Sequence, residues 1–424
     1  MSLSLNDLTE AVASAAGLRA RTDLEPLGGA GDKIFPPTYS VAEAADTKYA
    51  VEDRRVEGPD GARTERSVIL DSVASQANRM EEVLLENIRR GRLAAPVTSV
   101  DFASAGLPDL DRISDYEAPH RIFDAILRDS FDGSDLFRNG PVGRSITEAT
   151  SRNAAAVAHH SPHTLLFGGW DSTGPKGGRG SKYERALTSE IVALDVRAGV
   201  KTASRVDPLG IERQAGTIYE SAGDVGWTLV EAEAVRDGKK PKVYDRAGKG
   251  DVGRPSQLNH GNVTPSIDKA AGGVTADRIV ATTVLSFIQL RRLRFPTAPD
   301  GSAVDDDQRD AAENAARTAL AALGVAAAVL AFDAGFDLRS RCVLVPTRPL
   351  EFELVAGGGE RATFGLTPDE ALTLVRDAAE AADRAGLAWR VGERTLRPSA
   401  RLVELVRRSQ DVAVAAPVDV GIEG

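Results

Sequence analysis

The segment from Asp71 to Glu82 places hydrogen-bonding side chains along one face of a helical pattern. With a period of about 3.6 residues, apolar residues such as Ala77 and Met80 form a stripe suited to burial. The opposite face carries Ser72, Ser75, Gln76 and Arg79. Lys and Glu would serve solubility alone, whereas Ser and Asn weaken helix interiors because they compete for backbone hydrogen bonds. This face therefore indicates a polar partner: the sugar-phosphate chain of a nucleic acid, or another part of the same protein.

A glycine-rich loop at residues 168–182 has the composition of a phosphate-binding loop. ATP hydrolysis is not expected, because the order Gly180-Ser181-Lys182 lacks the Gly-Lys-Ser/Thr that runs directly into a helix. The glycines still permit close approach to a polyanion, with Lys176, Arg179 and Lys182 beside it. Trp170 can stack on a base or anchor the loop. The alternative is an ordinary surface loop.

Two clusters contain the residue types of metal sites. Three histidines within 159–163 can in principle ligate zinc, but no carboxylate lies between them and adjacent histidines usually point apart. Three aspartates within 109–115 can in principle hold Mg²⁺ for phosphodiester cleavage, although aspartates also cap helices well. We expect a solvated loop and helix caps, and therefore no metal ion and no other cofactor.

Covalent catalysis lacks a sequence signature in this chain. The Gly-x-Ser-x-Gly motif is absent, and Cys342 is the only cysteine. A single cysteine excludes an internal disulfide and a thiolate zinc cluster. The apolar residues that follow Cys342 predict a buried strand. We therefore expect a protein that is not an enzyme.

The charge of the chain is unevenly distributed. A net charge of -10 argues at first against nucleic acid, since non-specific affinity comes mainly from Lys and Arg at phosphates. Acidic residues crowd the segment 300–313, whereas 239–254 contains only Asp245 and Asp251 as acids. The basic residues there are Lys239, Lys240, Lys242, Arg246, Lys249 and Arg254. This segment predicts a protruding basic hairpin, with a solvated loop as the alternative.

Length and composition allow a large core in two or three domains, since the chain has 424 residues of which 42% are hydrophobic. The first residues lack a basic stretch followed by an apolar run, and no stretch approaches the ~18 consecutive apolar residues of a membrane span. We therefore expect a cytoplasmic protein without a membrane partner.

The elements that position these residues form a mixed pattern. Helices are predicted at 5–16, around 71–88, and at 115–129, 275–294, 307–332, 367–385 and 399–408. Strands are predicted at 164–167, 189–196, 341–345 and 351–355, with hairpins or an ordered insertion at 200–260. Helices alternating with short strands indicate an α+β fold rather than a regular doubly wound sheet.

Several unusual blocks follow one another in the order found in a known family. They are residues 71–79, 118–130, 167–172, 259–263 and 285–295. Over about residues 24–296, the chain resembles the type I-U (also called I-G) CRISPR-associated RAMP protein, the backbone subunit of that subtype's Cascade complex. The last third of the chain matches more loosely.

The resemblance implies an α+β fold with an RRM-like, ferredoxin-type RAMP core, large helical and loop insertions and a projecting thumb. In this interpretation residues 1–424 form a single RAMP backbone subunit. Its core is 24–198 and 259–360, its thumb-like basic insertion is 199–258, and its C-terminal helical part is 361–424. Copies of such a subunit polymerise head to tail along a CRISPR RNA, beside other Cascade subunits, and leave the bases free to pair with target DNA in antiviral defence. Acidic outer surfaces such as 300–313 would then meet adjacent copies.

The same resemblance implies RNA-binding roles for residues of the matching blocks and basic loops. We expect guide contacts from Ser72, Gln76, Asn78, Arg79, His120, Arg121, Lys176, Arg179, Lys182, Lys239, Lys240, Lys242, Lys249, Asn259 and His260. Two alternatives stay open at this point. One is a metal-dependent ribonuclease of the same superfamily that uses Asp111 and Asp115, and the other is a protein-interaction scaffold that never meets RNA.

Overall fold

The computed structural model describes residues 3–415 except 43–44, 59–60, 173, 175–179, 210, 212–215, 247–251 and 360. The chain divides into two compact units. The larger unit contains residues 1–39, 49–197 and 274–409. The smaller unit contains residues 40–48, 198–273 and 410–424. The mixture of helices and strands confirms the predicted α+β class.

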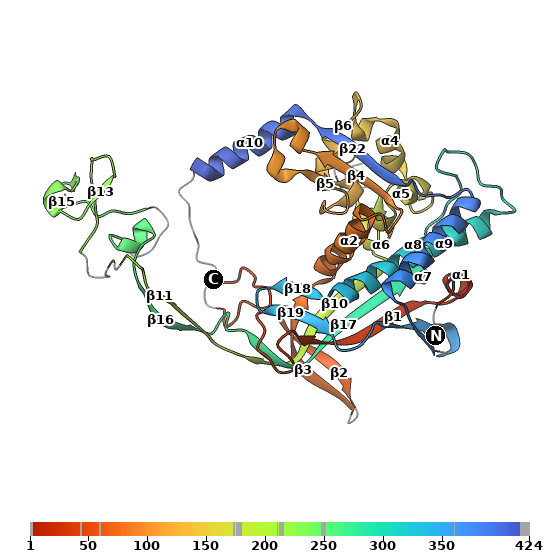
Figure 1. Cartoon of the computed structure of the whole chain (residues 1–424), viewed down its shortest axis with the longest axis horizontal. Helices are drawn as coiled ribbons and strands as arrows, with labels where there is room; N and C mark the ends of the chain where they lie inside the picture. The colour runs from red at the N-terminus through yellow and green to blue at the C-terminus, as the bar shows by residue number, and fades with distance from the viewer. Residues whose placement is uncertain are drawn as a thin grey trace. The chain divides into compact units, whose positions relative to one another are not determined.

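The larger unit is built on a curled, nine-stranded antiparallel sheet (Figure 1). Its strand order is β18-β19-β1-β17-β10-β3-β2, and β20 pairs with both β1 and β21. The strands are β1 (Gly17–Pro26), β2 (Val51–Gly58), β3 (Gly61–Asp71), β10 (Leu187–Ala198), β17 (Val274–Ser286), β18 (Phe336–Arg339), β19 (Cys342–Pro346), β20 (Glu351–Val355) and β21 (Arg361–Gly365).

Four long helices lie with this sheet: α1 (Leu5–Ser14), α2 (Val73–Arg89), α8 (Arg309–Ala334) and α9 (Pro368–Arg384). Helix α8 packs against the other three and against β17 and β19. Among the described helices, α8 alone is long and apolar enough to span a membrane by length and composition, and 94% of its most apolar window is buried inside the protein. Its many alanines permit this close packing on several sides.

Two of these helices, α2 and α8, lie in the connections between central strands of the sheet. In the order β19-β1-β17-β10, the helix α2 lies in the chain between β1 and β10, and α8 lies between β17 and β19. Along β1, the buried residues Leu18, Ala20 and Thr22 alternate with exposed Arg19 and Arg21. One face of the sheet is therefore covered by the core, and the other carries charged and polar side chains.

A second sheet in the larger unit has five strands, in the order β5-β4-β22-β6-β7. These are β4 (Pro96–Asp101), β5 (Arg112–Ser114), β6 (Ser130–Asp132), β7 (Asp135–Leu136) and β22 (Gly392–Pro398). Short helices surround it: α3 (Ala125–Arg128), α4 (Pro141–Glu148), α5 (Ala155–His160) and α6 (Pro162–Phe167). Other strands and α-helices are β8 (Gly169–Trp170), β9 (Lys182–Tyr183) and α7 (Phe287–Leu290) in the larger unit, and α10 (Ala400–Ala415), whose first ten residues belong to the larger unit.

The part of the smaller unit inserted between β10 and β17 contains three two-stranded antiparallel sheets among its described residues. Its pairs are β11 (Lys201–Arg205) with β16 (Val263–Asp268), β12 (Tyr219–Glu220) with β13 (Trp227–Thr228), and β14 (Arg236–Asp237) with β15 (Lys240–Pro241). The hairpins predicted for 200–260 are thus present. The inserted basic segment predicted at 199–258 falls within this unit.

Several predicted elements are confirmed near their expected bounds. Strand β20 matches the predicted 351–355, and β19 contains Cys342, which is fully buried. Helix α9 begins with the predicted capping box, in which Thr367 and Glu370 each accept a hydrogen bond from the other's backbone N–H.

Three predicted elements are wrong. Residues 274–286 form strand β17, where Ile279, Ala281, Thr283 and Leu285 are buried with the alternation of a strand. Residues 164–167 belong to helix α6, which has Pro162 in its first turn. The predicted helix at 115–129 is reduced to a 3₁₀ turn at 121–123 and the single turn α3.

Candidate nucleic-acid interface

The polar face of α2 is largely an internal contact. Asp71 ends strand β3, is 4% exposed, and accepts hydrogen bonds from Gln76 Nε2 at 2.7 Å and Arg79 Nε at 3.0 Å. Arg79 also donates to the carbonyl of Asp337 at 2.8 Å, so it links α2 to β3 and β18. Gln76 is completely buried. Its side chain is enclosed by the protein, and the guide contact expected of Gln76 stays a prediction.

Ser72 and Asn78 stand at different places on the same helix. Ser72 is the N-cap of α2, and its hydroxyl accepts from the Ser75 N–H at 3.3 Å. This cap explains the serine without any ligand. Asn78 is exposed. The guide-contact roles expected of Ser72, Asn78 and the partly exposed Arg79 stay predictions.

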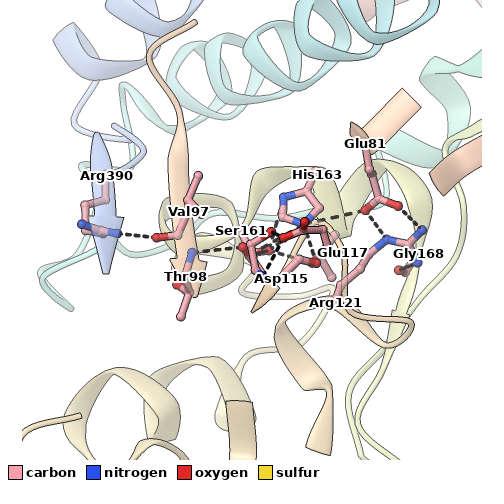
Figure 2. A network of polar contacts seen from close by, with 12 residues as sticks. Glu81, Val97, Thr98, Asp115, Glu117, Arg121, Ser161, His163, Gly168 and Arg390 are labelled. Atoms are coloured by element: carbon pink, nitrogen blue, oxygen red, sulfur yellow. Dashed lines mark hydrogen bonds and ion pairs between the residues drawn. The ribbon is translucent and has the colours of Figure 1, made fainter. Parts of the chain in front are cut away.

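Arg121 forms the most enclosed ion pair near this helix (Figure 2). Its Nε and Nη2 donate to the two carboxylate oxygens of Glu81 on α2 at 2.6 and 2.7 Å. Its Nη1 donates to the carbonyl of Gly168 at 3.0 Å, and its guanidinium lies over the Phe167 ring. Arg121 is only 6% exposed. This guanidinium clamps the start of the glycine-rich loop onto α2, and the guide contact expected of Arg121 stays a prediction.

A buried polar network continues from this ion pair (Figure 2). His163 Nε2 lies 3.7 Å from a carboxylate oxygen of Glu81 and 3.7 Å from one of Asp115. Asp115 accepts from the Thr98 N–H at 3.0 Å and from the Ser161 hydroxyl at 2.8 Å. Burial raises the pKa of Asp115 to about 7 and that of Glu81 to about 7, the latter against the opposing effect of Arg121. Burial also lowers the pKa of His163 well below its usual value, so this imidazole is neutral.

The start of the glycine-rich loop depends on two glycines. Gly168 has a φ of +87°, and a Cβ on Gly169 would come within 2.6 Å of Thr164. Strand β8 then pairs with β9, so that Trp170 lies opposite Lys182 in the ladder. The Lys182 ammonium lies 5.8 Å from the centroid of the Trp170 ring. Lys176 and Arg179 lie outside the described residues, so their expected roles stay predictions.

A hollow of about 550 Å³ opens beside this ladder. It brings together three of the predicted site residues, His120, Arg121 and Lys182. The rest of its lining includes Val73 of α2, exposed Trp170 and Arg185, and Gln289 of α7. The sequence-distant segments around 73, 120, 170, 185 and 289 therefore share one surface.

A second hollow of about 470 Å³ lies on the sheet next to the first, since Val73 and Thr188 line both. It is lined by Arg21 of β1, by Arg54 and Arg55 of β2, and by residues of β10 and β17. We treat the two adjacent hollows as one surface of the larger unit and call it the sheet groove.

The charge of the sheet groove is basic once its ion pairs are considered. Its three acidic residues each contact an arginine: Glu190 contacts Arg54 at 2.8 Å, Glu57 contacts Arg55 at 3.5 Å, and Glu184 contacts Arg292 at 2.9 Å. The exposed cations Arg21, Lys182 and Arg185 form no ion pair with any described residue. Three cations are thus available to an anionic ligand.

Sequence reasoning missed Arg21 and Arg185. Arg21 had a usable signal, because Gly17–Pro26 alternates apolar and polar residues as a half-buried strand does. Arg185 had no such signal in the sequence. It precedes β10 in an irregular segment, and only the fold brings it to the groove.

The smaller unit holds the remaining predicted site residues. Lys239 and Lys240 are exposed at the β14-β15 hairpin, and Lys242 forms an ion pair with Glu220 at 2.6 Å. Exposed Asn259 has a φ of +62° at the end of a 3₁₀ turn, and His260 Nδ1 lies 3.1 Å from Asp207. Lys249 lies outside the described residues. The RNA contacts expected of this unit stay predictions.

The candidate metal clusters do not assemble in the described part of the chain, where no group of three or more His, Cys, Asp and Glu residues is placed to hold a metal ion. Asp111 is exposed, whereas Asp115 is completely buried and hydrogen-bonded as above. The pair proposed for a ribonuclease therefore does not face one solvent-accessible site. His159 and His160 stack edge to face, and His163 is enclosed by the buried network.

Part of the chain matches one family model. Residues 18–198 match the family model described as CRISPR-associated protein GSU0053. The matched region runs from β1 into β10 and includes most of the sheet groove. None of the curated proteins matches the chain.

Proposed function

We propose that this chain, whose residues 18–198 match a CRISPR-associated family model, is an RNA-binding backbone subunit of a type I-U (I-G) Cascade complex. In this proposal, copies of the chain follow one another head to tail along the CRISPR RNA in the cytoplasm, with other Cascade subunits beside them. The protein holds the ribose-phosphate chain and breaks no bonds. Base pairing between guide RNA and target DNA then supplies the sequence recognition.

The arrangement of the large sheet supports an RRM-like core. A ferredoxin-type βαββαβ unit has its fourth strand beside the first, then the third and the second. Strands β19, β1, β17 and β10 lie in that order, with α2 and α8 in the two crossovers. The smaller unit then interrupts the hairpin between the second and third strands of the core. We propose that this unit, which carries Lys239 and Lys240, is the thumb.

The sheet groove is the observation that carries the proposal. RRM-type sheets bind single-stranded RNA on their open face. Here Arg21 lies on that face, while Lys182 and Arg185 lie in the adjoining hollow. Three cations that form no ion pair with described residues can displace counterions from RNA phosphates even though the whole chain is acidic.

The proposal can be tested with a triple variant, Arg21→Gln, Lys182→Gln and Arg185→Gln, titrated with a fluorescent single-stranded RNA at several salt concentrations. If each cation neutralises one phosphate, the slope of log affinity against log salt falls by about 2, since each contact to a single strand contributes ~0.7. The binding at low salt weakens at the same time.

The matched control removes the same charge elsewhere. Arg376, Arg384 and Arg408 are exposed on α9 and α10, so changing these three to Gln lowers the net charge equally. We expect the control to retain most of the salt slope. Equal slopes for the two triple variants would reject the sheet groove, and a wild-type complex purified from its CRISPR locus without small RNA would reject the function itself.

A further inference from the structure

The hollow beside Trp170 has the properties of a site for a planar ring. Trp170 is 44% exposed, although large aromatic side chains are normally buried, and the other two tryptophans of the chain, Trp227 and Trp389, are more enclosed. The volume of about 550 Å³ admits a ring system the size of a nucleobase together with its sugar. An exposed indole at the rim of such a hollow can stack on a base.

The backbone that carries Trp170 is held by contacts on both sides. The β8-β9 ladder places Trp170 opposite Lys182, and the Arg121 guanidinium binds the carbonyl of Gly168 two residues earlier. Arg121 is itself held by the bidentate ion pair with buried Glu81. These contacts position the backbone of Trp170 before a ligand arrives, which reduces the backbone entropy lost on binding.

Polar groups around the hollow fit a nucleotide rather than an apolar side chain. Lys182 and Arg185 lie where a phosphate can be neutralised, on the same lining as the ring. Half-buried Gln289 has a side-chain amide without a hydrogen-bond partner among the described residues, and an amide can donate to and accept from the edge of a base. The hydroxyl of Tyr183, another lining residue, is buried and likewise has no partner in the described part of the chain.

We propose that this hollow binds one unstacked nucleobase of the guide RNA, with Trp170 stacked on the base and Lys182 beside its phosphate. The inference rests on the proposed function and adds a base-binding subsite to the phosphate contacts of the sheet groove. Arg121 acts here as a positioning residue, because it touches the loop rather than the base.

The test uses the full-length chain and two RNAs of equal length, one an oligouridine and one with the same backbone but abasic. Trp170→Ala should weaken binding of the oligouridine roughly tenfold, since stacking on one aromatic side chain has an effect of this size. Its affinity for the abasic RNA should be unchanged. Trp170→Phe preserves a stacking ring and should stay within about threefold of the wild type.

A matched control is Tyr39→Ala, which removes an aromatic side chain that is 46% exposed and does not line the hollow. It should change neither affinity. If Trp170→Ala bound the oligouridine as tightly as the wild type, or lost the same factor on both RNAs, the base-binding subsite would be excluded while RNA binding by the protein stood. If the wild type bound neither RNA, the proposed function would fail together with the inference.

Discussion

Two regions of the larger unit carry polar and cationic side chains. In one region these side chains bind other residues of the protein, and in the other they are exposed to solvent. On α2, Gln76 and Arg79 bind buried Asp71, and Glu81 binds Arg121, so the polar groups are satisfied within the protein. In the sheet groove, Arg21, Lys182 and Arg185 are exposed and form no ion pair with described residues. The first region holds the fold together, and the second is available to a ligand.

The difference teaches that residue type alone does not identify a binding surface. A buried charge must be paired, because desolvation is costly, so a polar helix face can be required by the interior. An exposed cation needs no partner and remains available. Substitutions in the two regions should therefore differ in whether they change the stability of the protein or its RNA binding.

The largest effect is expected for Arg121→Ala, because it leaves the carboxylate of Glu81 buried without its partner. The free energy of unfolding should fall by about 3–5 kcal/mol, as measured by urea denaturation at pH 8. The control Arg185→Ala removes an exposed arginine of the groove and should change stability by less than ~0.5 kcal/mol. A similar loss in both variants would show that the two regions do not differ as described.

The next effect concerns pH and Asp115→Asn. The folded pKa of Asp115 is raised to about 7 from an ordinary value of 3.8, so between these values the native state holds a proton that the unfolded state releases. Raising the pH through this window therefore destabilises the wild type, and the neutral asparagine escapes the penalty. The stability of the variant relative to the wild type should rise with pH, by at most ~1.4 kcal/mol per pH unit.

Thermal melting of both proteins at pH 5 to 8 measures this trend. Glu81, His163 and Arg390 surround the site in both proteins, so their own titration contributes to both curves. Asp111→Asn, at an exposed aspartate, serves as the control with a constant difference from the wild type. A constant difference for Asp115→Asn as well would contradict the burial of its charge.

The smallest effect is expected from a pair of substitutions on neighbouring positions of α2. Gln76→Ala removes a buried hydrogen bond to a carboxylate and should cost about 1–3 kcal/mol of stability. Asn78→Ala changes an exposed side chain and should cost less than ~0.5 kcal/mol. Urea midpoints measure both effects.

RNA titration of the same pair sharpens the comparison. Gln76→Ala should bind RNA as the wild type does under conditions where it is folded, since its side chain has no exposed surface. A loss of RNA affinity without a loss of stability for Gln76→Ala would mean that the polar face of α2 meets RNA after all.

The elements predicted well are those whose signals are local. The capping box at Thr367 and Glu370 sets the start of α9, and apolar residues flanked by polar ones identify β20. The failures are segments in which two periods compete. Ile279, Val280 and Val284 fit a helical stripe, but β17 is specified by alternate burial between its neighbours β1 and β10.

The predicted site residues also depend on tertiary contacts that local sequence patterns do not reveal. His120, Arg121 and Lys182 were predicted and line one hollow, but Arg121 is paired with Glu81 there, and Gln76, also predicted, is completely buried. Their burial depends on Asp71 and Glu81, whose approach a single sequence does not reveal. Arg185 reaches the groove because β9 and β10 carry it beside β8, which no local pattern encodes.

By itself, the sequence determined the mixed helix and strand class, the long apolar helix, the absence of a disulfide within the chain and the similarity of residues 18–198 to a CRISPR-associated family model. These features depend on composition and on neighbours a few residues apart. Only the tertiary structure decided which polar residues face inward and which cations share the groove. Burial and proximity are properties of segments distant in the chain, and they arise only when the sheet and its helices pack together.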